Sequence, residues 1–231
     1  MSRALVRRAC LVGLGLLASE SCAAQYHPEL PTRWSNRVTN PFFPLVPGTT
    51  FRSTSQRETV VVEVLVQPRL VHGVPATAVR DRVYSNGALK EDTEDWFAQD
   101  SAGNIWYLGE DSRELEDGRV VGTEGSWKWG EDGALPGIIM WADPARHVGQ
   151  SYRQEYRKGI AEDWGKVLAT GQNVAVGYGS LTDCIKTEDW SGLERGGREH
   201  KYYCPQIGLV LETSTTGRNR LELIERSETK D

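Results

Sequence analysis

Short runs of alternating apolar and polar residues fill the chain from residue 51 to its C-terminus. Residues 59–66 form a β-branched run, and residues 76–84 alternate before Asn86-Gly87, a two-residue hairpin signal. Asp117-Gly118 gives a second such turn. No long segment has apolar residues at the 3.6-residue period of a helix, so the pattern predicts strands.

The same criteria predict further strands, and the connections between them are short enough for antiparallel neighbours. The region 125–145 is predicted as a long loop, because Asp132-Gly133 and Pro136-Gly137 interrupt its alternation. The fold class predicted is therefore all-β: an antiparallel meander of about ten strands, forming a barrel or a curved half-barrel. The further strands are expected near residues 89–99, 105–109, 150–156, 161–168, 180–190, 198–204, 207–214 and 220–225.

The N-terminal region divides into an export signal and an arm. Residues 1–24 carry an arginine-rich start, a short apolar run and small residues before Gln25, the expected mature start. Cys22 leaves lipidation as the alternative to cleavage. Residues 25–50 are rich in proline and are predicted to form an irregular arm over a single β domain, residues 51–231. We therefore expect a periplasmic or extracellular protein with no transmembrane span.

Composition narrows the classes of molecule that the chain is expected to bind. The formal net charge is −5, and removal of the signal would leave −7, which argues against nucleic acid and anionic membranes as partners. Eight tryptophans and eight tyrosines suit both pleated sheets and ligand-binding faces. The oligomeric state is not predicted.

Two cysteines remain after the signal, Cys184 and Cys204, and in an oxidising compartment they are expected to form a disulfide. If the bridge joins neighbouring antiparallel strands, opposing residue numbers add up to 388. Glu188 then faces His200, and Trp190 faces Arg198.

A second register follows from the turn at residues 101–104. A loop of two or four residues gives opposing numbers that add up to 205, which places Asp95 opposite Glu110; a three-residue loop would break this register. Carboxyl groups held this close share a proton or a cation. Asp95, as base or nucleophile, and Glu110, as acid, are the candidate catalytic pair for a hydrolase or lyase acting on polysaccharide.

Other side chains could complete a ligand site. No cofactor and no metal site is predicted, with Ca²⁺ on Asp95 and Glu110 as the alternative to an unliganded pair. Glu155 and Glu162 would oppose each other if Lys158-Gly159 forms a turn, and could reach the same cavity. A solvated acidic edge remains the structural alternative for all these carboxylates. The candidate aromatic ligand-binding residues are Trp96, Trp106, Trp127, Trp129 and Trp141.

The segment 95–107 reads Asp-Trp-Phe-Ala-Gln-Asp, then Gly-Asn-Ile-Trp-Tyr after two residues. It resembles the signature of a family of secreted bacterial proteins, D-W-[FY]-A-Q-D-x-x-G-N-[IV]-W-Y. Segments 40–49, 124–127, 136–138, 152–156 and 199–205 resemble the same family. The resemblance implies an exported β protein and transfers no catalytic residue. In architecture the strand run also resembles half-barrels that carry lipids between envelope membranes.

Three functions are therefore in competition. The first is an exported protein that binds a small apolar, amphiphilic or saccharide ligand. The second is the carboxylate-pair enzyme, and the third is a structural or interaction protein of the envelope. A cavity that receives the acidic side chains would favour the first two over the third.

Overall fold

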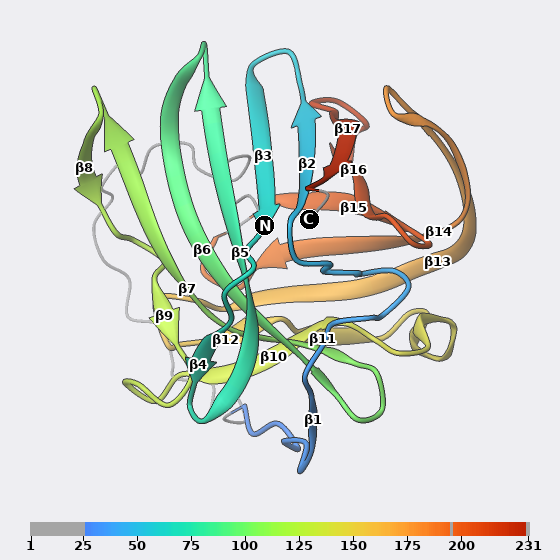
Figure 1. Ribbon diagram of the computed structural model, residues 1–231. Helices are drawn as coiled ribbons and strands as arrows, with labels where there is room; N and C mark the ends of the chain where they lie inside the picture. Colours follow the sequence, from blue (N-terminus) through green and yellow to red (C-terminus); the bar gives the residue numbers. More distant parts are fainter. Residues whose placement is uncertain (1–25, 195, 230–231) are drawn as a thin grey trace, which may run out of the picture.

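The computed structural model describes residues 26–194 and 196–229, and the predicted export signal lies outside the described residues. These residues form one antiparallel sheet that curls into a nearly closed barrel (Figure 1). The all-β prediction is confirmed. Within the described residues, the helical content is a single 3-10 turn, Pro144–His147.

The first wall of the barrel is made by long hairpins. The turn at Asn86-Gly87 joins β5 to β6, and Asp117-Gly118 joins β7 to β8, both as predicted. β5, β6 and β7 stand side by side in Figure 1. The elements of this wall are β2 (Thr49–Thr54), β3 (Glu58–Val64), β4 (Arg69–Val71), β5 (Val74–Ser85), β6 (Ala88–Asp100), β7 (Ile105–Glu116), β8 (Arg119–Gly122) and β9 (Trp127–Lys128).

The second wall runs across behind the first (Figure 1). It is a meander in which each strand pairs with the next along the chain. Its elements are β13 (Asp163–Val176), β14 (Gly179–Ser191), β15 (Arg198–Cys204), β16 (Gly208–Ser214) and β17 (Leu221–Glu228).

Two seams join the walls. At one seam the last strand, β17, pairs with β2, so the C-terminal part of the fold meets the start of the domain. At the other, β10 (Leu135–Met140) pairs with both β7 and β12 (Glu155–Tyr156), while β11 (Ser151–Arg153) pairs with β13. Most inward-facing side chains are therefore shielded from solvent.

The second seam corrects the sequence prediction for residues 125–145. This region was expected to be a loop, yet it contains β9 and β10. Gly137 lies inside β10 because a Cβ there would be 2.5 Å from the carbonyl oxygen of Arg153, so only glycine permits this approach. The glycine that suggested a loop marks a place where two backbones lie in contact.

The N-terminal arm packs on the domain as expected. Its short strand β1 (Trp34–Ser35) pairs with the end of β6. Phe43 is buried, with its ring 5.2 Å from that of Phe97 and 6.3 Å from that of Tyr203. The arm thus contributes to the main hydrophobic core, which also holds Ile105, Trp106, Trp129 and Met140.

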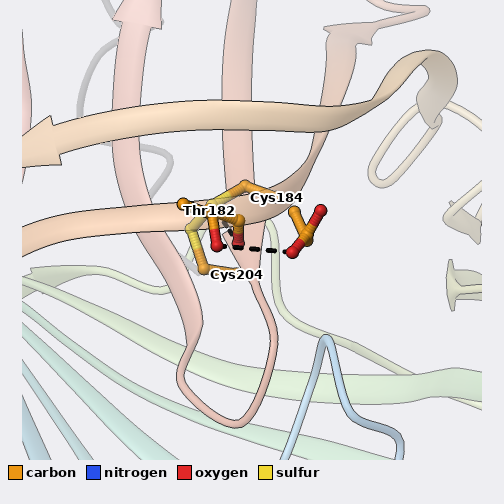
Figure 2. Close-up of a disulfide and its surroundings, with 4 residues drawn as sticks. Thr182, Cys184 and Cys204 are labelled. Atoms are coloured by element: carbon orange, nitrogen blue, oxygen red, sulfur yellow. Dashed lines mark hydrogen bonds between the residues drawn. A yellow bond between two sulfur atoms is a disulfide. The ribbon is translucent and has the colours of Figure 1, made fainter.

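The predicted disulfide and its register are both confirmed. Cys184 and Cys204 are bonded, with Cα atoms 4.1 Å apart (Figure 2). The neighbouring pairs Glu188–His200 and Trp190–Arg198 are in the register that the bridge predicts. Both cysteines are buried in a small apolar cluster with Val210, Leu211 and Leu223. The bridge therefore ties β14 to β15 next to the barrel interior.

Candidate ligand-binding site in the barrel interior

The predicted acidic pair lies inside the barrel. Asp95 on β6 is in register with Glu110 on β7, and both side chains are buried. The hydroxyl of Tyr107 lies between them, 2.5 Å from a carboxylate oxygen of Asp95 and 2.7 Å from one of Glu110. The predicted register of Asp95 opposite Glu110 is confirmed.

A β-bulge produces this arrangement. The loop after β6 brings Gln99 opposite Ile105, a register that alone would not pair Asp95 with Glu110. An irregularity between Trp96 and Phe97 shifts the pairing by one residue and restores it. The shift also lets Tyr107 and Glu110, three residues apart, point to the same face of the sheet.

Gly109 makes the bulge possible. Its φ is 139°, and a Cβ at this position would be 2.4 Å from the carbonyl oxygen of Trp127. A side chain cannot be placed there without moving β9. Gly109 therefore supports the acidic pair although it carries no functional group.

Tyr107 has one proton to donate to two carboxyl groups. Burial, and then the charges of Asp95, Glu110 and Glu155, raise the pKa of this phenol well above its usual value, so it stays protonated. Its hydroxyl makes short contacts with a carboxyl oxygen of Asp95 and one of Glu110. Asp95, Tyr107 and Glu110 thus form one acidic unit linked through this hydroxyl.

Glu155 extends this unit. It accepts a 2.7 Å hydrogen bond from the indole nitrogen of Trp127, whose ring packs edge-on against Tyr107 at 5.4 Å. β12 carries Glu155 inward because it pairs with β10, which places Glu155 opposite Pro136. The expected opposition of Glu155 and Glu162 is therefore not formed.

Glu162 lies elsewhere, in the turn between β12 and β13. It makes a 3.4 Å contact with Arg153 and accepts a hydrogen bond from the backbone of Gly159. Its role in this position is to order the turn.

A buried lysine forms the opposite side of the interior. The ammonium of Lys201 on β15 lies 3.3 Å from Asp189, 3.1 Å from Glu199 and 3.8 Å from Glu212. Burial alone would lower the pKa of Lys201, but the three carboxylates hold it well above its usual value. This network was not predicted, although the register confirmed at the disulfide already pairs Asp189 with Glu199.

Two cavities lie against this network. A polar cavity of about 40 Å³, enough for a few water molecules, has Lys201 in its wall. An apolar cavity of about 60 Å³ has Glu212 in its wall. The 3.8 Å contact between these two residues therefore lies between the cavities. The polar cavity is lined by Phe97, Tyr107, Glu110, Ile139, Gln154, Glu155, Asp163, Asp189, Lys201 and Tyr203.

The predicted aromatic platform is not assembled as one surface. Trp127 reaches the acidic unit, whereas Trp106 and Trp129 pack around Trp34 in the core at 6.1 and 6.0 Å. Trp96 donates a hydrogen bond to Glu94, away from the interior. Trp141 stacks on His147 at 3.8 Å. Most of these indoles therefore fill or cover the core.

A metal centre finds no support in this part of the chain. Within residues 26–194 and 196–229, no three His, Cys, Asp or Glu side chains are grouped so that they could hold a metal ion. None of the described helices has the length and apolar character needed to cross a membrane.

Comparison with known proteins gives two remote structural likenesses. The chain is 15% identical to a candidate exported protein with a YmcC-like fold from Bacteroides fragilis, over 81% of this chain and 99% of that one, with a TM-score of 0.46. A candidate lipoprotein from Parabacteroides distasonis is 11% identical over the same shares, with a TM-score of 0.41. Because both TM-scores are below 0.5, neither likeness assigns this chain a family or a function.

No protein-family model matches the chain, and no curated protein matches it. The resemblance to the secreted family with the D-W-[FY]-A-Q-D signature therefore stays a prediction.

Proposed function

We propose that this chain is an exported protein that binds a small amphiphilic molecule inside its barrel. The observation that carries the proposal is the pair of adjacent cavities, one polar and one apolar, with the Lys201–Glu212 contact between them. A ligand whose apolar part lies in the apolar cavity and whose polar end reaches Glu212 matches such a site.

The cost of the buried charges argues against a purely structural barrel. Asp95, Glu155 and Asp189 are 0%, 2% and 4% exposed, and Lys201 is 7% exposed. Burying ionisable groups is expensive, and well-packed apolar residues of similar size are often as stable or more stable. A barrel that served only as a scaffold would be expected to fill its interior with aliphatic side chains, as the region around Ile105 and Met140 does.

The apolar cavity supports the proposal that part of the ligand is apolar. Its walls come from the arm, from β2 and β3, and from β16 and β17, so residues far apart in the chain converge on it. They are Phe43, Pro44, Leu45, Phe51, Ser53, Val60, Val62, Asp81, Ile207, Gly208, Leu209, Glu212 and Leu221. Hydrocarbon placed here would contact aromatic and branched side chains on several sides.

Export rests on the N-terminal pattern and on the disulfide. The arginine-rich start, the apolar run and the small residues before Gln25 match a secretory signal. The bond between Cys184 and Cys204 fits an oxidising compartment, since such bonds are rare in the reducing cytosol.

A matched pair of substitutions tests the binding proposal. Val62 lines the apolar cavity, while its neighbour Val61 lines an open groove on the other face of β3. Titration of the purified protein with the neutral fluorophore N-phenyl-1-naphthylamine should give saturable binding that Val62→Trp weakens at least tenfold and Val61→Trp leaves unchanged. Equal effects of the two variants, or no saturable binding to the unsubstituted protein, would refute binding in this cavity.

The carboxylate-pair enzyme is the second candidate, favoured by the register that places Asp95 opposite Glu110, although the hydroxyl of Tyr107 lies between them. A saccharide would have to displace that hydroxyl to lie between Asp95 and Glu110, which is why we place binding first. If the chain cleaves a polysaccharide, Asp95→Asn and Glu110→Gln should each abolish release of reducing ends. Retained turnover in both variants would exclude this mechanism.

A further inference from the structure

The apolar cavity contains two carboxyl groups that a hydrocarbon-binding pocket does not need. Asp81 comes from β5 and Glu212 from β16, and both side chains line the cavity. They are 3% and 4% exposed. The charge of Asp81 contributes to the raised pKa of Glu212, after burial of that carboxyl as the largest cause. Two acids from opposite walls therefore meet in one mostly apolar space.

Glu212 has an oxygen available for a ligand. Its Oε2 atom is buried and accepts no hydrogen bond from any of the residues described in the structure. The ammonium of Lys201 is 3.8 Å away, beyond hydrogen-bond distance, and has closer contacts with Asp189 and Glu199. A buried acceptor without a donor is costly, and a donor brought by a ligand would remove that cost.

We propose that the apolar cavity binds a primary alkylammonium group, with its nitrogen at Glu212 and its alkyl chain against Phe51, Val62 and Leu209. This inference deepens the proposed function and rests on it, because it specifies the polar end of the amphiphile. An ammonium group carries three donors and a positive charge, which suits a buried carboxyl oxygen that accepts no hydrogen bond from the described residues.

The interior already accommodates a group of this chemistry. The side chain of Lys201 is itself an alkylammonium, surrounded by three carboxyl groups within 3.8 Å. A second alkylammonium at Glu212 would meet the same kind of acceptor. A carboxylate amphiphile would bring no donor, and an alcohol would bring one donor without charge.

The ionisation of Glu212 supports a cationic ligand. Burial raises the pKa of Glu212 to about 8. Glu212 therefore holds a proton near neutrality. An ammonium that displaces such a proton gains a charge-assisted hydrogen bond in a site with little water.

Calorimetric titration of the purified protein with n-hexylammonium, n-hexanol and hexanoate tests the inference. We expect n-hexylammonium to bind at least tenfold more tightly than n-hexanol, and hexanoate more weakly than either. Glu212→Gln should weaken n-hexylammonium about 10- to 100-fold and leave n-hexanol unchanged, as expected for loss of a charge-assisted hydrogen bond. Glu225→Gln, at an exposed position of β17, is the matched control and should change neither affinity.

The outcomes separate the two proposals. If n-hexanol binds as tightly as n-hexylammonium and Glu212→Gln changes neither, the cavity binds amphiphiles without selecting a cation, and this inference is wrong while the proposed function stands. If none of the three probes binds, both are wrong. Unchanged affinity for n-hexanol shows that Glu212→Gln is folded; if that variant does not fold, Glu212→Asp, which keeps the carboxyl and shortens the side chain, must weaken n-hexylammonium more than n-hexanol.

Discussion

Replacement of Glu212 by glutamine should change how the stability of the protein depends on pH. In the folded state burial raises the pKa of this carboxyl from 4.5 to about 8, so the folded protein holds a proton that the unfolded chain releases. The stabilisation from that proton is fully present below about pH 4.5 and is lost as the pH rises toward 8.

The size of the effect follows from proton linkage. One extra proton bound by the folded state changes the free energy of unfolding by about 1.4 kcal/mol per pH unit, so Glu212 should account for a loss of about 3 kcal/mol between pH 5 and pH 7. Asp81, with a pKa raised from 3.8 to about 7, should also contribute a loss of stability as the pH rises, over a pH range that lies about one unit lower than that of Glu212. In Glu212→Gln the amide remains neutral, and the contribution of Glu212 disappears.

Urea unfolding followed by tryptophan fluorescence at pH 5, 6, 7 and 8 measures this dependence. The unsubstituted protein should lose stability as the pH rises, and the Glu212→Gln profile should be flatter, so that the difference between the two grows toward pH 8. Glu225→Gln, which changes an exposed carboxyl, should run parallel to the unsubstituted protein. If the Glu212→Gln profile runs parallel as well, the carboxyl is not a protonated, desolvated group in the folded state.

Three further predictions concern the fold and export. Gly109→Ala should lower the free energy of unfolding by at least about 3 kcal/mol or prevent folding, because its Cβ would collide with Trp127. Gly87→Ala, with open space around it, should lower it by about 1–2 kcal/mol in the same urea assay. Equal losses in the two variants would contradict the account of the bulge. Replacing Cys184 and Cys204 together by serine should lower the free energy of unfolding by roughly 3 kcal/mol, and a loss well below 1 kcal/mol would show that the bridge contributes little. Intact-mass measurement of protein from the periplasmic fraction should give a chain that begins at Gln25, whereas a diacylglycerol-modified Cys22 would establish the lipoprotein alternative.

The strands and registers could be predicted because their signals are local. Asn86-Gly87 and Asp117-Gly118 specify tight turns, and the alternation on either side assigns each residue to a face. The disulfide then fixes one inter-strand register, which the structure reproduces.

The pairing of Asp95 with Glu110 was predicted correctly, although the path to it differs. The turn near Gln99 has the register that would have broken the pair, and the bulge at Gly109 restores it. A sequence shows a glycine there but not the neighbouring backbone that requires it. The same difficulty hid β10, where Gly137 reads as a strand breaker but serves the close approach of Arg153.

The cavities and their acids could not be derived from single strands. Glu212 meets Asp81 only because β16 and β5 lie on opposite walls of a barrel that closes through β17 and β2. Closure of the barrel depends on the whole sheet, and no local turn motif in the sequence predicts it. The tryptophans were predicted to form a ligand-binding surface, but most of them pack in or on the core, because aromatic residues suit both environments.

The most direct test of the central claim is a crystal structure of the protein grown with n-hexylammonium. The account predicts electron density for the ligand in the apolar cavity, with the nitrogen within hydrogen-bond distance of Glu212 and the alkyl chain against Phe51 and Val62. A cavity without ligand under conditions that saturate binding in solution, or ligand bound outside the barrel, would contradict it.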